Sequence, residues 1–334
     1  MGLNSIRPSL TLCVIGCGAY AAHFCENLKR AQSPAKLFFA SRDLSKARDY
    51  CHRFGGSGFF GSYQQAAEAE EIDALYVCTP HHLHREHSEL GIGNGKHILV
   101  EKPITQDIDS AKNLLSSAKN AGVTLMVAEN VRFLAQVRLC KRLLDEGTIG
   151  SVRLIQFQEE YPFAPGSWRS SLAQSGGGVL IDGGIHKIHA MRYLAGEPVS
   201  VSAIEPPKVM EGREGEDSMV LQLRWAGGAA GIINHSWTAA TPLRPSLTIA
   251  GTRGRISLEI GDGRVFLDTG QKTRSWNLEP DFGGIPAMVR EFEASISGGR
   301  APETSGEEGL NDLKLVLAAY DSAQTGKEIR LDDP

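Results

Sequence analysis

The sequence predicts an α/β N-terminal domain followed by an α+β C-terminal domain. Three observations support this fold class: strands and helices alternate in the first part, a glycine-rich turn follows the first strand, and the later part is rich in strands. The chain has 334 residues, enough for two domains with sizeable cores. We expect domains at residues 1–148 and 149–334, although the two closing helices could pack back on the first domain.

In the first domain, short apolar segments alternate with segments that carry apolar residues at helical spacing. The expected strands are residues 10–16, 35–41, 73–80, 97–103 and 123–130, and the expected helices are residues 19–31, 43–54, 83–93, 107–122 and 131–147. This alternation favours a parallel sheet that is covered on both faces.

In the second domain, strands and helices no longer alternate, because strand-like segments follow one another with glycine-rich turns between several of them. The expected strands are residues 151–161, 217–225, 229–237, 246–251, 254–260 and 263–268, and the expected helices are residues 184–195, 286–297 and 307–325. Such a series predicts a mainly antiparallel sheet.

Composition excludes several classes of function. Hydrophobic residues make up 41% of the chain and charged residues 22%, which is typical of a globular protein. The net charge of -4 argues against a nucleic-acid binder. No apolar run is long enough for a membrane span, and the N-terminus lacks the features of a signal peptide. The six cysteines form no CxxC pair, so we expect free thiols in a cytoplasmic protein, without membrane or nucleic-acid partners.

The glycine-rich turn has the pattern GxGxxA and lies between the first strand and the first helix. Gly16 permits a tight turn, Gly18 lets the backbone approach a pyrophosphate, and Ala21 allows close packing of helix on strand. The free N–H groups of the helix start at Ala19 and Tyr20 favour phosphate charge. The motif therefore predicts a dinucleotide site, whereas its plain alternative is an ordinary strand–helix turn.

The end of the second strand indicates which dinucleotide binds. An acidic residue there would bind the ribose hydroxyls of NAD, but this chain has Ser41 and Arg42. Arg42 can form a charge-assisted fork to a 2′-phosphate, and Ser41 can donate a hydrogen bond. The following Asp43 fits the N-cap of the next helix. We predict NADP, with NAD as the other option.

Two more strands end in polar residues. Thr79 and Pro80 follow the third predicted strand, and Glu101 and Lys102 follow the fourth. Because ligands of an open parallel sheet bind beyond the carboxyl ends of its strands, these four residues should converge near the glycine-rich turn. Pro103 favours an extended conformation at Lys102, which could aim the side chain into the cleft.

The segment DGGIHKIH places Asp182, His186 and His189 three or four residues apart, so the three side chains share one face if the segment is helical. Residue types alone leave three interpretations open: a metal site, a catalytic acid–base pair, or a core helix that carries histidines.

Taken together, the GxGxxA turn, the EKP motif, the Trp-Arg pair at 168–169 and GGGVLIDGGIH resemble the Gfo/Idh/MocA family of oxidoreductases over essentially the whole chain. The resemblance implies an N-terminal Rossmann domain and a C-terminal domain with a large, mostly antiparallel open sheet. That sheet often forms an oligomer interface, so we expect a homodimer or homotetramer. Most members use NAD or NADP to oxidise or reduce a hydroxyl or ketone of a sugar, inositol or related polyol.

The resemblance also implies roles for single residues. Lys102 matches the lysine that hydrogen-bonds the reacting oxygen, His186 matches the general acid–base, and Asp182 matches the carboxylate that contacts substrate and supports the histidine. It places His84, with Thr79 and Pro80, beside the cofactor. His189 stands where many members have Asp, and from its position we expect it among the substrate-binding residues.

Other residues have weaker assignments. His81, His82, His84 and His87 lie close together, but no acidic or cysteine ligands accompany them, so we expect no metal.

The segment AENVRF ends another strand. Glu129, Asn130 and Arg132 fit contacts to nicotinamide or substrate, while Asn130 also fits a helix cap. Trp168 and Arg169 could cover the cofactor or line a sugar site.

Two other classes of function remain open from the sequence. One is a non-catalytic NAD(P)-sensing regulator on the same fold, and the other is a redox-neutral NAD-dependent glycosidase. The joint presence of Lys102, Asp182 and His186 favours the enzyme over the sensor. The glycosidase would use NAD, so the expected binding of a 2′-phosphate by Ser41 and Arg42 argues against it.

Overall fold

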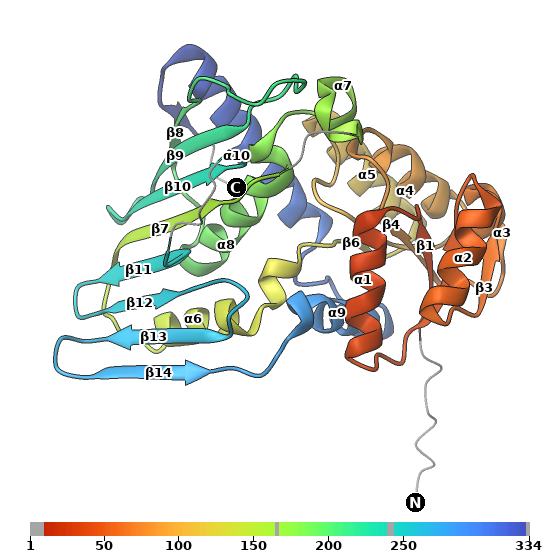
Figure 1. The fold of residues 1–334 in the computed structure, drawn as a ribbon, viewed down its shortest axis with the longest axis horizontal. Helices are drawn as coiled ribbons and strands as arrows, with labels where there is room; N and C mark the ends of the chain where they lie inside the picture. Colours follow the sequence, from red (N-terminus) through yellow and green to blue (C-terminus); the bar gives the residue numbers. More distant parts are fainter. Residues whose placement is uncertain (1–9, 164–166, 239–243, 332–334) are drawn as a thin grey trace, which may run out of the picture.

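The computed structural model describes residues 10–163, 167–238 and 244–331. A six-stranded sheet and a nine-stranded sheet lie side by side (Figure 1). The outermost parts of the two predicted domains, residues 1–9 and 332–334, lie outside the described residues. No helix in the described ranges combines the length and the apolar character that crossing a membrane requires.

The six-stranded sheet is parallel and has the order β3-β2-β1-β4-β5-β6. Its strands are β1 Thr11–Ile15, β2 Lys36–Ala40, β3 Gly58–Phe60, β4 Ala74–Val77, β5 His97–Val100 and β6 Leu125–Val127. The five strands expected from the sequence are present. The three-residue β3 was not predicted, because so short a segment carries no usable periodicity.

Helices connect these strands and cover the sheet, and the strands β1 and β4 are buried along their whole length. The helices are α1 Ala19–Arg30, α2 Leu44–Phe54, α3 Tyr63–Glu68, α4 His84–Gly93, α5 Ile108–Ala121 and α6 Ala135–Asp145. The strand order reverses at β1, which pairs with both β2 and β4. A crevice at the carboxyl ends of these strands is the usual ligand site of such a sheet.

The nine-stranded sheet has the order β14-β13-β12-β11-β7-β10-β9-β8-β15. Its strands are β7 Val152–Glu160, β8 Ser200–Ile204, β9 Ser218–Arg224, β10 Ala230–Ser236, β11 Leu247–Gly251, β12 Arg255–Leu258, β13 Arg264–Asp268, β14 Thr273–Asn277 and β15 Ile329–Arg330. Among the described strands of this second sheet, only β7 and β10 pair in parallel, so its predicted mainly antiparallel character is confirmed. The sequence missed β8, β14 and β15; β14 is mostly exposed and β15 has two residues.

One face of the nine-stranded sheet is covered by helices α6, α8 Ile185–Ala195 and α10 Gly306–Thr325. In Figure 1 the sheet lies in front of these helices. The helix α9 Ile285–Gly298 lies beside α1, and Met288, Val289 and Phe292 join the core that includes β1 and α1. Helix α10 also contacts α5 and β6, so both closing helices pack against the first domain.

The segment before α8 has a conformation that the sequence did not predict. A π-helical turn, Leu180–Gly184, precedes α8, whereas we expected an ordinary helix from about Gly184. The Glu216 carboxylate holds this turn, since it accepts hydrogen bonds from the backbone N–H groups of Gly178 at 2.7 Å and Leu180 at 2.8 Å. Tyr320 of α10 donates a third hydrogen bond to the same carboxylate at 2.8 Å.

The close approach of Glu216 explains the glycine run. A Cβ atom at Gly178 would lie 1.9 Å from the backbone oxygen of Glu216, closer than any real contact. Gly178→Ala should therefore lower the free energy of unfolding by about 1–3 kcal/mol, as overpacking of a well-packed core does. Chemical denaturation measures this loss. Gly227→Ala is the control, because no atom lies within 4 Å of the added Cβ there; equal stability of the two variants would contradict the packing argument.

Candidate active site

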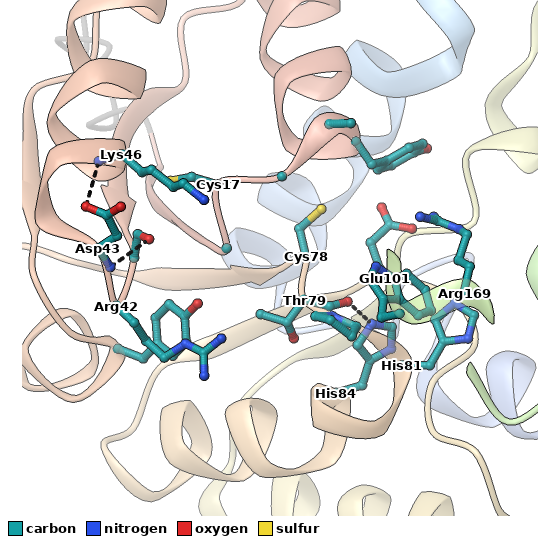
Figure 2. A pocket seen from close by; sticks show the side chains of 18 of the residues that line it. Cys17, Arg42, Asp43, Lys46, Cys78, Thr79, His81, His84, Glu101 and Arg169 are labelled. Atoms are coloured by element: carbon teal, nitrogen blue, oxygen red, sulfur yellow. Dashed lines mark hydrogen bonds between the residues drawn. The ribbon is translucent and has the colours of Figure 1, made fainter. Parts of the chain in front are cut away.

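A cavity of about 510 Å³ lies at the carboxyl ends of β1, β2, β4 and β5. Figure 2 shows Arg42, Asp43 and Lys46 at one end of it and Glu101, His81 and Arg169 at the other, with Cys78 and Thr79 between them. Most of the predicted cofactor-binding residues line this cavity: Gly16, Gly18, Ala19, Tyr20, Ser41, Arg42, Thr79, Pro80, His84, Glu101 and Lys102.

The glycine-rich turn fits a dinucleotide. Gly16 has a φ of +100°, and a Cβ there would lie 2.7 Å from the backbone oxygen of Cys78. Gly18 faces open space, with no atom within 4 Å of an added Cβ. Gly18 is also the N-cap of α1, and no side chain caps this helix, so its first N–H groups are available to a phosphate.

The end of the cavity that lies beyond β2, called the far end below, carries two cations. Arg42 and Lys46 both line it, together with Ser41. The Asp43 carboxylate is engaged as the predicted N-cap of α2, since it accepts hydrogen bonds from the backbone N–H groups of Ser45 at 3.0 Å and Lys46 at 3.4 Å. The hydrogen bond from the Ser45 hydroxyl is the main reason that the pKa of Asp43 is lowered. Lys46 was missed from the sequence, although its place in the first turn after Asp43 was a usable signal.

Asp182 lies next to the other end of this cavity, where Lys102, Arg169 and the imidazole of His81 surround its carboxylate. Its Oδ2 accepts a hydrogen bond from Arg169 Nε at 3.0 Å, and its Oδ1 lies 3.5 Å from Lys102 Nζ and 3.6 Å from His81 Nε2. Lys102 Nζ also donates a hydrogen bond to the backbone oxygen of Asp182. Burial alone would raise the pKa of Asp182, but Lys102, His81 and Arg169 hold it well below its usual range.

His186 has a different partner from the one we expected. Its Nδ1 lies 2.6 Å from Glu129 Oε1, whereas the sequence reading assigned its support to Asp182. Asp182 is directed to Lys102 and Arg169 because the π-helical turn separates it from the regular register of α8. Burial would raise the pKa of Glu129, but its contact with His186 outweighs this and lowers the pKa to about 2. Burial lowers the pKa of His186, although Glu129 opposes the shift.

A second cavity of about 660 Å³ adjoins the first. Tyr20, Lys102 and Arg169 line both cavities, and Asp182 and His186 line the second. The second cavity is also bounded by the polar side chains of Asn27, Glu159 and Lys187, by the aromatic rings of Tyr161 and Phe163, and by the loop 280–283. Lys102 therefore lies at the junction of the two spaces, with Asp182 and His186 on the side of the second.

Two residues expected to contact the substrate lie elsewhere. Arg132 lines neither cavity; its guanidinium stacks over the ring of Tyr193 at 3.8 Å and lies 3.5 Å from Glu303. His189 is fully buried and also lies outside both cavities, with Nδ1 2.8 Å from Asp312 Oδ2. Both side chains point into packing between helices, so neither is placed to contact a substrate.

Asn130 and Trp168 line different cavities from those expected from the sequence or from their neighbours. Asn130 lines the second cavity instead of the cofactor cavity. It is not the helix cap either, because the Glu129 side chain accepts the hydrogen bond from the N–H of Val131. Trp168 lines only the first cavity, which separates it from Arg169, a residue common to both.

The four clustered histidines contact backbone or hydroxyl oxygens, and His82 Nδ1 lies 3.2 Å from the backbone oxygen of Gln174. His81 Nδ1 lies 2.7 Å from the backbone oxygen of Ser175, and His87 Nδ1 lies 3.1 Å from Thr79 Oγ1. The two ring nitrogens of His84 lie 2.7 Å from the oxygen of Pro103 and 2.9 Å from that of Thr79. Within the described ranges, no group of three or more acidic, histidine or cysteine side chains is arranged to hold a metal ion.

Comparison with known proteins agrees with this architecture. A family model described as the oxidoreductase family with an NAD-binding Rossmann fold matches residues 10–129, and the GFO/IDH/MocA C-terminal domain matches residues 137–257.

Relatives match nearly the whole chain. An oxidoreductase of Rhizobium meliloti called ORF334 is 30% identical over 94% of this chain and 96% of its own. The myo-inositol 2-dehydrogenase of Thermotoga maritima is 25% identical over 96% of this chain and 98% of its own. The crystal structure of aldose-aldose oxidoreductase from Caulobacter crescentus, solved with glycerol, is 26% identical, covers 97% of this chain and 100% of its own, and superposes with a TM-score of 0.88. The chain therefore belongs to the Gfo/Idh/MocA family and is an NAD(P)-dependent oxidoreductase.

Proposed function

We propose that the protein transfers a hydride between NADP and the hydroxyl-bearing or ketone carbon of a sugar, inositol or related polyol. The observation that carries the proposal is the position of Lys102, at the junction of the two cavities and next to Asp182 and His186. Two of the relatives support the substrate class, since their names describe action on myo-inositol and on aldoses.

The choice of NADP rests on the far end of the first cavity. Arg42 and Lys46 supply two positive charges there, and Ser41 supplies a hydroxyl. A 2′-phosphate would add charge-assisted hydrogen bonds to these groups, while the ribose of NAD would offer the two cations only neutral hydroxyls.

Lys102 is suited to hold the reacting oxygen. A bound nicotinamide would supply the redox chemistry. The substrate oxygen carries negative charge once a hydroxyl has lost its proton, or once a ketone carbon has received a hydride. The Lys102 ammonium stabilises that charge, while Asp182 and its backbone oxygen hold the ammonium in place.

His186 is suited to move the proton. Its Nδ1–H donates to the Glu129 carboxylate, which leaves Nε2 as the acceptor for a hydroxyl proton during oxidation. In the reverse direction the same nitrogen returns the proton to the oxygen. The lowered pKa of His186 keeps the ring neutral near pH 7, the form that oxidation requires.

The second cavity offers matching groups for a polyhydroxylated substrate. Asn27, Glu159 and Lys187 provide donors and acceptors, and the faces of Tyr161 and Phe163 provide apolar contact.

We also propose that copies of this chain assemble through the nine-stranded sheet into a homodimer or homotetramer. Phe266 of β13 is 39% exposed and Ile204 of β8 is 68% exposed. Analytical ultracentrifugation of the full chain measures the state, and a monomer at micromolar concentration would contradict the proposal.

The function is tested with a panel of sugars and inositols and with NADP or NAD, followed at the absorbance of the reduced nicotinamide. We expect turnover of at least one polyol with NADP. Product analysis separates oxidation or reduction from net hydrolysis of a glycoside, and hydrolysis without net change in nicotinamide would replace the proposed reaction.

Removal of either catalytic side chain should abolish most turnover. Lys102→Ala should lower kcat by about 10²–10³-fold, because the charge on the oxygen loses its stabilising cation. His186→Ala should lower kcat by about 10²–10⁴-fold, the usual contribution of a general acid–base. Nicotinamide fluorescence should show cofactor binding largely retained. Lys272→Ala, an exposed lysine, is the control; full activity in the Lys102 and His186 variants would rule out the mechanism.

Removal of the cations at the far end should weaken NADP alone. Arg42→Ala and Lys46→Ala should each raise KM for NADP by about 10-fold to 100-fold and leave KM for NAD nearly unchanged, because a lost charged hydrogen bond costs affinity only where the 2′-phosphate exists. Arg48→Ala is the matched control, since Arg48 is exposed on the same helix and does not line the cavity. A clear preference of the unmodified protein for NAD would show that the assignment is wrong.

A further inference from the structure

His189 lies on the face of α8 that is turned toward the segment 129–133. The residues His186, His189 and Tyr193 are three and four positions apart and therefore share one side of this helix. Glu129 contacts the first of them and Arg132 stacks on the last, and α8 packs directly on the segment 130–133. His189 is thus placed between two residues that are already joined to that segment.

The surroundings of His189 favour a positively charged ring. Its Nδ1–H donates to Asp312 of α10 at 2.8 Å, and Arg192 binds the other oxygen of the same carboxylate. Burial alone would lower the pKa of His189, but Asp312 and Glu129 outweigh burial and raise it. Arg132 opposes this shift, and Arg192 is a second cation at the Asp312 carboxylate. The other ring nitrogen of His189, Nε2, is buried without a hydrogen-bond partner among the described residues, as is Oε2 of Glu129.

Glu129 needs a cation besides His186. Its side chain is 1% exposed, and its Oε2 has no hydrogen-bond partner among the residues that the structure describes. A buried carboxylate beside a neutral imidazole is costly unless another charge compensates it. Lys102 and His189 both favour the ionised form of Glu129, and the nearby Glu101, whose pKa burial raises to about 7, opposes it where it is ionised. Lys102 also binds the backbone oxygen and the carboxylate of Asp182, so a protonated His189 would give Glu129 a second positive charge.

We propose that His189 is a positioning residue for catalysis: as an imidazolium held by Asp312, it keeps Glu129 ionised while His186 is neutral. Ionised Glu129 in turn keeps the proton of His186 on Nδ1, so that Nε2 faces the substrate cavity as the proton acceptor. His189 touches neither substrate nor cofactor and acts only through Glu129. The role rests on the proposed function of His186 as the acid–base.

The proposal predicts the order in which two histidines titrate. In the full chain labelled with ¹⁵N, NMR of the ring nitrogens should show His189 carrying both ring protons at a pH where His186 carries only the proton on Nδ1. This measurement needs neither a substrate nor a variant. A neutral His189 at that pH, or His186 protonated only on Nε2, would overturn the proposal.

Substitutions give a second readout. His189→Gln removes the positive charge proposed for His189. Neutral His186 together with ionised Glu129 carries a net negative charge, which then lacks a compensating cation, so His186 loses its proton less readily. The pKa of His186 should therefore rise by about 0.5 unit or more. The acidic limb of kcat/KM for oxidation should move to higher pH by the same amount. His189→Lys, which keeps a positive charge, should restore both values toward those of the unmodified protein.

A structural control separates this effect from loss of stability. Ser322→Ala removes a buried hydroxyl of α10 that accepts a hydrogen bond from the N–H of Ala203 in β8. It should lower stability and leave the titration of His186 unchanged. If His189→Gln behaves like Ser322→Ala, with a lower melting temperature and an unmoved pH profile, His189 has only a packing role.

The two hypotheses fail in different ways. Full turnover in His186→Ala would remove the proposed function of His186, whatever the NMR titration shows. Loss of turnover in His186→Ala combined with an unmoved titration in His189→Gln would remove only the role of His189.

Discussion

The arrangement of the two domains at the site depends on one buried ionic contact, that of the Asp182 carboxylate with Lys102 and Arg169, beside the imidazole of His81. Lys102 and His81 come from the first domain, while Asp182 and Arg169 come from the second. A carboxylate that is 8% exposed would be unstable without these partners, so the cluster forms only when both domains are in place. The same contact brings Lys102 to the junction of the two cavities.

The local backbone keeps Asp182 where this contact requires it. The π-helical turn before α8 is held by Glu216, whose carboxylate binds two backbone N–H groups and the hydroxyl of Tyr320. Glu216, which lies just before β9, thereby connects the segment 178–180 with α10. Because of this turn, the side chains of Asp182 and His186 point in different directions. Asp182 contacts Lys102, and His186 contacts Glu129.

Much of the fold and most of the cofactor cavity could be predicted, because both depend on short-range patterns. Burial on both faces makes strands such as β1 and β4 continuous apolar segments, and a strand followed by GxGxxA and a helix specifies a turn around Gly16. The exposed β14 and the two-residue β15 lack such a pattern, since pairing with a neighbouring strand creates them. Glu129 was visible as a candidate, but its partner was not.

The sequence by itself determined the order of most strands and helices and the glycine-rich turn, for these follow from residue type and spacing within short segments. The roles expected of Lys102, Asp182 and His186 came from the resemblance to the family. Only the tertiary structure decided that Glu129 holds His186, that Lys46 joins Arg42, and that His189 is buried against Asp312. The physical reason is that helical spacing tells which residues share a face of α8. Which elements cover that face is set by the packing of α10 and the segment 129–133, which lie far from α8 in the chain.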